Sequence, residues 1–344
     1  MEKQYTLKLI ETRKETIDTF SFILKQPGLR KIKYTAGQYI TLSLNINGRK
    51  YKRAYSFSSS PSVDENLKIT IKRVPNGIVS NYLIDKINVG DIIEVSEPMG
   101  EFIFNQEKNP SQVFLWAAGS GITPIYSILN QLLISNPSIQ IHLIYGNSTK
   151  DEAIFLNELK ELAINYQEQF VLNLFFSRNS EMQVESSILG RINSDFVKGY
   201  TLNHHNPINE CQHFICGPSQ MKKMIIESLQ NIGVSEDIIF SEDFELTVNE
   251  QDLTEVIDSE VELNVNGSGH KIFVQKGKTI LDAYLDNGID LPYSCQTGSC
   301  NTCKATILSG EAKMIGVKER NDLCKHETLL CCSFPLTQNI QIEI

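Results

Sequence analysis

The sequence of 344 residues predicts three domains: an antiparallel β-barrel, a doubly wound α/β domain and a small α+β domain. Three observations predict this. Strand-like segments alone fill the first part of the chain, strands and helices alternate after residue 110, and a new strand pattern begins near residue 260. We expect domains at 1–108, 109–244 and 260–344, with a linker at 245–259.

The N-terminal domain is predicted to be all-β because its apolar residues alternate or form β-branched runs, with breaks at glycine and proline. About six short strands with few helical stretches favour a closed barrel. The clearest strand segments are residues 5–11, 19–25, 38–46 and 66–74.

The middle domain is predicted to be a parallel sheet covered by helices, because apolar strand runs alternate with helix-period segments. The expected strands are residues 113–119, 139–146, 170–176 and 212–217. The expected helices are residues 123–133, 152–163 and 219–233, the last one ending at a glycine.

Residues 109–149 contain no Asp, Glu, Lys or Arg, and this length would admit a membrane helix. Gly119, Gly121 and Pro124 interrupt the segment, so buried strands flanking a helix fit it better. The N-terminus shows no secretory signal. We therefore expect a cytoplasmic protein without membrane insertion. The formal net charge of −9 and the lack of a Lys/Arg-rich run argue against nucleic-acid binding.

The last domain begins after the acidic segment 245–259, which has no basic residue and no clear periodicity. Strand patterns at 261–265 and 270–274 precede a helix near 279–287. A stretch rich in cysteine follows. Because cytosolic thiols stay reduced, clustered cysteines there indicate metal or redox use in preference to disulfides.

Three of these cysteines have the spacing C-x4-C-x2-C, and a fourth follows after 27 intervening residues, in a vicinal pair. Four thiolates with a distant fourth ligand are typical of a plant-type [2Fe–2S] cluster. A zinc site or unliganded core cysteines are the alternatives, but zinc ligands usually come in two close pairs. The small and polar residues between the cysteines allow main-chain N–H groups to point at the sulfurs.

These last 85 residues resemble a plant-type [2Fe–2S] ferredoxin domain, which has the β-grasp fold. In that family the fourth ligand lies four residues before a proline, and Pro335 therefore favours Cys331 over Cys332. The resemblance implies the metal ligands Cys295, Cys300, Cys303 and Cys331.

The barrel carries the motif Arg53-Ala54-Tyr55-Ser56 at the end of an expected strand. An arginine can hold a phosphate, an aromatic ring can lie on a flavin, and a hydroxyl can bond its N5 edge. Ordinary surface and core roles are the alternative for such residues. Gly77-Ile78-Val79-Ser80 opens a short helix, where exposed N–H groups favour a pyrophosphate.

Two further motifs lie at the carboxyl ends of expected parallel strands, where ligands bind in open α/β sheets. Residues 119–124, Gly-Ser-Gly-Ile-Thr-Pro, follow one buried strand and open a helix. Cys216-Gly217-Pro218 follows another. The alternatives that need no ligand are a simple tight turn for the glycine motif and a buried strand residue for Cys216.

The order and spacing of these motifs, with Glu242-Asp243-Phe244, resemble the ferredoxin–NADP reductase superfamily across residues 1–244. The resemblance implies FAD, with FMN less favoured, and NADPH or NADH as the electron donor. It places Ser56, Cys216 and Glu242 at the reacting centre. The implied cofactor-binding residues are Arg53, Ala54, Tyr55, Ser56, Gly77, Val79, Ser80, Gly119, Gly121, Thr123, Ser177, Arg178, Cys216, Gly217 and Phe244.

One position departs from the family pattern, because Ser148 stands where many relatives have an arginine beside the adenosine phosphate. Ser177-Arg178 can supply a cation for a 2′-phosphate, which favours NADPH over NADH. The lack of a hydrolytic motif agrees with chemistry carried by cofactors.

The combined resemblance implies an NAD(P)H oxidoreductase in which a hydride reaches the flavin and single electrons pass through the cluster to a docked protein. The partner implied is an oxygenase, with phenylacetyl-CoA epoxidase in phenylacetate catabolism ranked first. The alternatives are a reductase for a desaturase or Rieske oxygenase, a redox module without turnover, and an enzyme acting directly on a small molecule such as nitric oxide or a quinone.

Overall fold

The computed structural model describes residues 4–28, 32–105, 110–178, 187–204, 210–265, 267–317 and 319–344. The chain divides into two compact units. The first comprises Met1–Leu42 and Tyr55–Glu242, and the second comprises Ser43–Ala54 and Asp243–Ile344. Among the described residues, no helix combines the length and apolar composition needed to cross a bilayer.

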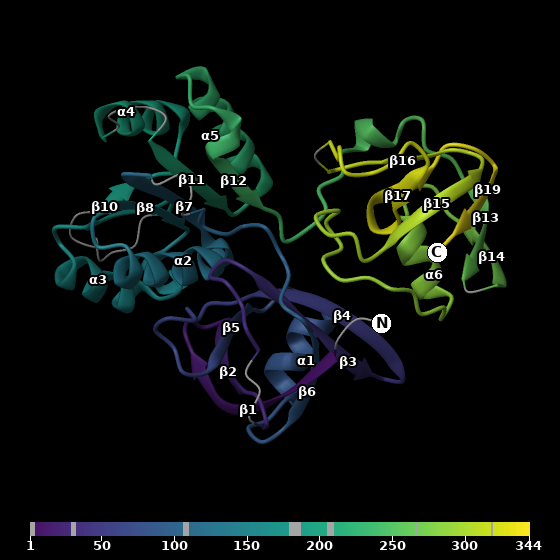
Figure 1. Cartoon of the computed structure of the whole chain (residues 1–344), viewed down its shortest axis with the longest axis horizontal. Helices are drawn as coiled ribbons and strands as arrows, with labels where there is room; N and C mark the ends of the chain where they lie inside the picture. Colours follow the sequence, from purple (N-terminus) through teal and green to yellow (C-terminus); the bar gives the residue numbers. More distant parts are fainter. Residues whose placement is uncertain are drawn as a thin grey trace. The chain divides into compact units, whose positions relative to one another are not determined.

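The N-terminal sheet has six strands in the order β4-β3-β6-β1-β2-β5 (Figure 1). Alternating apolar residues such as Leu7, Leu9 and Phe22 are fully buried inside it. A bridge between Phe57 and Ile69 joins its two ends, so the sheet closes as an antiparallel barrel. Its elements are β1 (Gln4–Lys14), β2 (Thr19–Lys25), β3 (Tyr39–Ile46), β4 (Arg49–Ser56), β5 (Leu67–Lys72), α1 (Ile78–Lys86) and β6 (Ile92–Ser96).

The second sheet is parallel, with the order β10-β9-β8-β7-β11-β12. Helices α2 and α3 pack on one face and α4 and α5 on the other, as Figure 1 shows. The prediction of a doubly wound domain is confirmed. Its elements are β7 (Gln112–Ala118), α2 (Ile122–Ser135), β8 (Gln140–Asn147), α3 (Leu156–Asn165), β9 (Phe170–Phe176), β10 (Ser187–Leu189), α4 (Ser194–His204), β11 (Cys211–Cys216), α5 (Ser219–Asn231) and β12 (Ile239–Glu242).

Helix α3 begins at Leu156, four residues later than the expected start at residue 152. The reason is Phe155, which takes a left-handed backbone conformation with φ of 61° and is buried against Tyr126. Tertiary packing of this aromatic ring therefore overrides the helical pattern of residues 152–155.

The third sheet is mixed, with the order β14-β13-β19-β15-β17, and α6 packs its apolar face against it. This arrangement confirms the predicted small α+β domain. The expected linker packs on it through Val256, which is fully buried beside Ile315 and Phe334. The elements are β13 (Ser259–Val265), β14 (Ser268–Val274), α6 (Ile280–Asp286), β15 (Lys304–Ser309), β16 (Ala312–Met314), β17 (Glu327–Leu329), β18 (Ser333–Pro335) and β19 (Asn339–Glu343).

Candidate functional site

Strand β4 carries the flavin motif predicted from the sequence. Arg53 is exposed, Ala54 and Tyr55 are half-buried, and Ser56 is buried at the end of the strand. The Arg53 guanidinium donates a hydrogen bond to its neighbour's carbonyl, from Nη1 to Lys52 O at 2.9 Å. The motif therefore presents a cation, a ring and a hydroxyl along one strand.

Ser56, Cys216 and Glu242 lie together in the first unit. The Ser56 hydroxyl donates a hydrogen bond to Glu242 Oε2 at 3.1 Å. Strand β12 runs parallel to β11, and its register places Glu242 opposite Cys216. Both strands end here, at the carboxyl edge of the sheet, where ligands bind in α/β domains.

The Cys216 thiol is almost completely buried, and this desolvation raises its pKa well above the ordinary value. The Glu242 carboxylate adds to the rise, and the Lys222 ammonium opposes it. The thiol is therefore neutral near pH 7. A neutral thiol lacks the nucleophilic character of a thiolate, so it can lie against a nicotinamide ring without adding to it.

The turn after β7 presents main chain and no bulky side chain. Gly119 has φ of 54°, a left-handed conformation that glycine adopts without strain. A Cβ on Gly121 would overlap the carbonyl oxygen of Cys216, so the turns after β7 and β11 touch backbone to backbone. The buried Thr123 hydroxyl donates to Ser120 O at 3.1 Å and fixes the turn. This geometry suits close approach by a dinucleotide.

The start of α1 offers main-chain N–H groups to an anion. Gly77 precedes the helix in an extended conformation, and the first turn contains no acidic residue. Val79 and Ser80 are buried. The Ser80 hydroxyl accepts a hydrogen bond from Val74 N at 3.1 Å, so it braces the turn. Phosphate binding here would rest on the helix N-terminus, as the sequence predicts.

Ser177 and Arg178 follow β9 and lie beside the end of β8. Ser177 N donates to Asn147 O at 3.0 Å, and Arg178 N donates to Ser148 O at 2.9 Å. Both side chains are exposed. The structure thus brings Arg178 next to Ser148, where the family places its cation. Phe244 belongs to the second unit and is 45% exposed, and its expected contact with the flavin stays a prediction.

The four predicted metal ligands come together in the second unit. Cys295 shares side-chain hydrogen bonds with Cys300 and Cys331, and Cys303 shares one with Cys331. These bonds lower the pKa of Cys295 and raise that of Cys331. Among the described residues, no group of three or more His, Cys, Asp or Glu side chains is arranged to hold a metal ion.

The chemistry of this thiol group fits a [2Fe–2S] cluster. Thr297 N donates to Cys295 Sγ at 3.4 Å, as expected for a loop that wraps its N–H groups around sulfur. Gln296 and Gly298 have positive φ values of 59° and 73°, which curl the loop tightly. Cys332 Sγ donates to Leu329 O at 3.3 Å, and its side chain is also bonded to Cys331. Cys331 is the member of the vicinal pair that has side-chain hydrogen bonds to Cys295 and Cys303.

Arg320 is a further residue of the cluster loop, and sequence reasoning missed it. Its guanidinium donates to the carbonyl of Gly298 and to Asn301 Oδ1, both within the cysteine loop. Asp322 accepts from Arg320 Nε at 2.8 Å and from Asn301 Nδ2 at 3.1 Å. The position of Arg320 in the sequence, 17 residues after Cys303, carries no pattern that would have revealed this contact.

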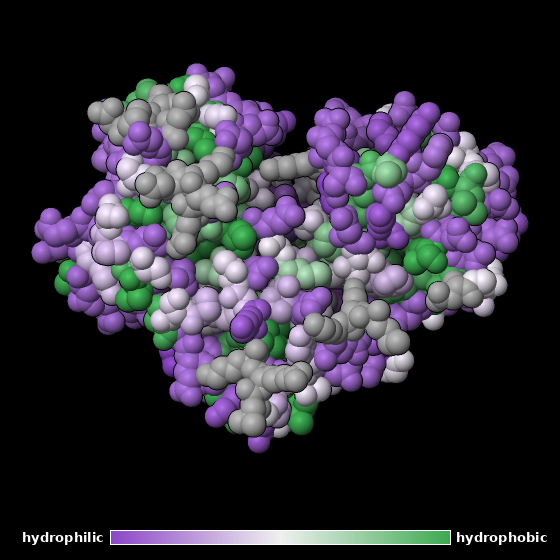
Figure 2. Space-filling model, viewed as in Figure 1, coloured by the Kyte–Doolittle hydropathy of each residue, from purple (hydrophilic) through white to green (hydrophobic). Residues whose placement is uncertain are grey.

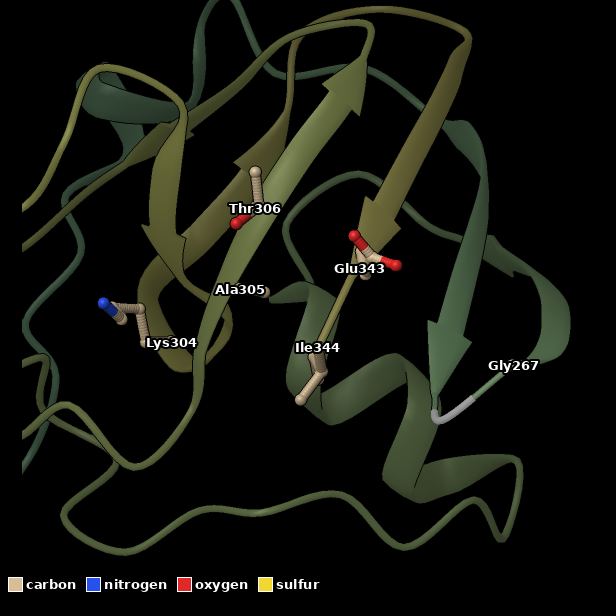
Figure 3. A pocket seen from close by; sticks show the side chains of 6 residues that line it. All are labelled: Gly267, Lys304, Ala305, Thr306, Glu343 and Ile344. Carbon is tan, nitrogen blue, oxygen red and sulfur yellow. The ribbon is translucent and has the colours of Figure 1, made fainter.

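A pocket of about 310 Å³ lies elsewhere on the ferredoxin-like domain, beside β15 and the end of β19 (Figure 3). Its side chains point in different directions and do not converge on one point. The ammonium of Lys304 pairs with Glu327 at 2.7 Å. The pocket contains none of the four cysteines, and we do not assign it to the electron-transfer site. It is lined by Gly267, Lys304, Ala305, Thr306, Glu343 and Ile344.

Three family models match the chain in order. An oxidoreductase FAD-binding domain matches residues 6–104, and an oxidoreductase NAD-binding domain matches residues 115–227. A 2Fe-2S iron-sulfur cluster binding domain matches residues 263–336. These matches agree with the three expected domains, whose boundaries remain predictions.

Curated relatives match nearly the whole chain. The ferredoxin reductase component of 3-ketosteroid-9-alpha-monooxygenase from Rhodococcus rhodochrous is 31% identical, over 96% of this chain and 93% of the relative. A component of 1,2-phenylacetyl-CoA epoxidase from Escherichia coli is 30% identical, over 98% and 97%. The solved structure of phthalate dioxygenase reductase has the same three-domain fold, with a TM-score of 0.70, 22% identity and coverage of 99% of this chain and 98% of that one.

Proposed function

This chain belongs to the family of NAD(P)H-dependent FAD reductases with a C-terminal [2Fe–2S] domain, and from this premise we propose that it passes electrons from NADPH to phenylacetyl-CoA epoxidase. At the coarser level it is an electron-transfer reductase component of a multicomponent oxygenase. The observation that carries the proposal is that one chain holds both a flavin–nicotinamide site and a group of four cysteines.

Bound FAD would supply the step that links a two-electron hydride donor to a one-electron cluster. The chain's own residues would bind the flavin, the nicotinamide and the cluster and would orient them for transfer. Ser56, held by Glu242, would present its hydroxyl to the flavin N5 edge. Cys216 would form an uncharged wall for the nicotinamide, and the glycine turn would receive the dinucleotide. The cysteine loop would hold the cluster in the second unit.

The preference for NADPH rests on Arg178. The main-chain N–H of Arg178 is bonded to Ser148 O, so Arg178 lies beside the position where many relatives have an arginine. A guanidinium binds a phosphate with two parallel hydrogen bonds, which a ribose hydroxyl cannot offer. Replacing Arg178 with Ala is expected to raise KM for NADPH by roughly tenfold or more and to leave KM for NADH nearly unchanged. Equal effects on both nucleotides would contradict the preference.

The choice of phenylacetyl-CoA epoxidase is supported by the Escherichia coli relative, of which 97% aligns with this chain. A second candidate is an oxygenase of the 3-ketosteroid-9-alpha-monooxygenase type, since its reductase component is equally similar. The visible face of the ferredoxin-like domain is mostly hydrophilic, with scattered apolar residues (Figure 2). A polar surface of this kind suits transient docking of a redox partner.

The test measures substrate oxidation by each purified oxygenase component, with this chain and NADPH as the sole source of electrons. We expect phenylacetyl-CoA to be oxidised in step with NADPH consumption. Oxidation of a 3-ketosteroid alone would favour the second candidate. Fast NADPH turnover with a quinone or nitric oxide, and no electron transfer to either oxygenase, would contradict the proposal.

A further inference from the structure

Lys222 is a buried lysine in the first turn of α5, and only 5% of it is exposed. The next residue, Lys223, lies on the same helix and is exposed, with Glu227 as its ion-pair partner at 3.9 Å. The two lysines therefore share a helix and a charge but differ in surroundings. Lys222 follows Cys216-Gly217-Pro218 closely in the sequence, and that motif belongs to the expected nicotinamide site.

The placement of Lys222 is unfavourable on two general grounds. Burying an ammonium removes its hydration, which costs free energy unless the charge is bonded. The first turn of a helix carries partial positive charge, which repels a cation. The structure shows what offsets these costs: Lys222 Nζ donates a hydrogen bond to the main-chain oxygen of Glu242 at 3.0 Å.

Glu242 is the last residue of β12, a strand of four residues at the edge of its sheet. Such a short edge strand pairs with one neighbour and is held weakly by its ladder. Lys222 binds the main chain of Glu242, and Ser56 binds its carboxylate at 3.1 Å. The three residues form one chain of contacts that runs from α5 through β12 to the end of β4.

We infer that Lys222 is a positioning residue, which anchors the end of β12 so that the Glu242 carboxylate stays on the Ser56 hydroxyl. The inference rests on the proposed function, because it assigns Ser56 to the flavin edge. In this proposal the role of Lys222 is to position Glu242 and not to bind a cofactor. It acts through Glu242 and Ser56, and its loss would misplace the hydroxyl and slow flavin reduction without weakening nucleotide binding.

The alternative is that Lys222 contributes only the packing of its aliphatic stem. The variant Lys222→Met separates the two, because methionine keeps an unbranched apolar stem and removes the ammonium. Lys223→Met is the matched control on the same helix. Both are made in the full-length holoprotein, with FAD and iron content checked against the unchanged chain.

Anaerobic stopped-flow reduction by NADPH gives the limiting rate constant and the Kd of the nucleotide. We expect Lys222→Met to lower the rate constant by roughly tenfold and to leave Kd within about threefold. Lys223→Met should keep both within about twofold. A Lys222→Met variant that keeps FAD and is reduced at the unchanged rate would overturn the inference.

A double-mutant cycle with Ser56→Ala tests whether Lys222 acts through Glu242 and Ser56. If it does, adding Lys222→Met to Ser56→Ala changes the rate constant by less than about twofold. If the decreases in rate constant caused by Lys222→Met and by Ser56→Ala multiply in the double variant, Lys222 acts by another route, which would contradict the inference. If Lys222→Met loses FAD, Lys222→Arg keeps a charged donor and should retain the rate within about threefold. A Lys222→Arg variant that keeps FAD but loses more of the rate would also count against it.

Hydrogen exchange supplies a readout that does not depend on catalysis. Amides of residues 239–244 should exchange several-fold faster in Lys222→Met than in Lys223→Met, because the end of β12 opens more often. Unchanged exchange would overturn the anchoring role. If NADPH and NADH both fail to reduce the unchanged holoprotein, the proposed function fails, and the exchange experiment still tests the anchor on its own.

Discussion

The hydroxyl of Ser56 donates a hydrogen bond to the carboxylate of Glu242 at 3.1 Å, although the two residues are 186 positions apart. Ser56 ends β4 and Glu242 ends β12, so the bond joins the barrel to the edge of the parallel sheet. Ser56 is 6% exposed, which shields this bond from water. The contact links the expected flavin strand with the expected nicotinamide sheet.

Replacing Ser56 with Ala removes this link. We expect the rate of flavin reduction by NADPH to fall by roughly a hundredfold, because the hydroxyl group that Glu242 orients toward the proposed flavin edge is lost. FAD content should stay unchanged, since Ser56 is not among the residues that we expect to bind the phosphates, which are Arg53 and the start of α1. Stopped-flow absorbance measures the rate. A rate within about twofold of the unchanged chain would show that Ser56 does not act at the flavin.

Replacing Gly121 with Ala places a methyl group against the carbonyl oxygen of Cys216. The turn after β7 must then shift, and we expect a loss of about 1–3 kcal/mol in stability together with weaker binding of NADPH. Gly199→Ala in α4 is the control, because nothing lies within 4 Å of its added Cβ. That change should stabilise the helix by about 0.5–1 kcal/mol. Thermal unfolding and nucleotide titration measure both effects, and similar behaviour of the two variants would contradict the packing argument.

Burial predicts slow alkylation of two cysteines. Desolvation raises the pKa of Cys211 to about 12 and raises that of Cys216 further above its ordinary value. The thiolate is the reactive form, so a raised pKa leaves less of it at any pH below that value. From pH 7 to pH 9, roughly, iodoacetamide should modify exposed Cys324 at least about a hundredfold faster than either buried thiol.

Peptide mass spectrometry of the native holoprotein measures this difference. The reactivity of Cys211 should rise as the pH is raised toward 12, because its thiolate fraction grows. Comparable alkylation rates at Cys216 and Cys324 would mean that Cys216 is open to solvent. That result would contradict the proposal that Cys216 is a buried, uncharged thiol beside the nicotinamide.

Removing Arg320 should loosen the cysteine loop. Arg320→Met loses the bonds to Gly298 and Asn301, which order the loop between the ligands. We expect the cluster to bleach roughly tenfold faster under a chelator, since supporting contacts of metal ligands commonly contribute about 10–100-fold in affinity. Lys325→Met, an exposed lysine nearby in the sequence, is the control. Equal bleaching rates for the two variants would show that Arg320 does not stabilise the cluster.

The sequence predicts the parts of this protein that depend on local pattern. Alternation gives the barrel strands, and the apolar run of β9 matches its expected bounds of 170–176. Cysteine spacing finds all four clustered thiols. Glycines before the helix identify the turn after β7, because a backbone with positive φ leaves a compositional signal.

Long-range contacts leave no such signal. In the sequence, Lys222 is one of two adjacent lysines in a helical segment, and nothing local distinguishes it from Lys223. Its burial depends on the position of Glu242 in the sheet. Arg320 lies in a polar loop, and its role depends on the return of that loop to Gly298. Phe155 breaks an apparently helical stretch because its ring packs on Tyr126. In each case the decisive partner is fixed by tertiary packing, so periodicity and spacing cannot reveal it.

The most direct test of the electron path is anaerobic reduction of the purified holoprotein, with NADPH and NADH in separate samples, followed by visible absorbance and low-temperature EPR. We predict flavin bleaching together with the rhombic EPR signal of a reduced [2Fe–2S] cluster, and faster reduction by NADPH. Flavin bleaching with no cluster signal would contradict this path, because Cys295, Cys300, Cys303 and Cys331 would then not form the one-electron outlet.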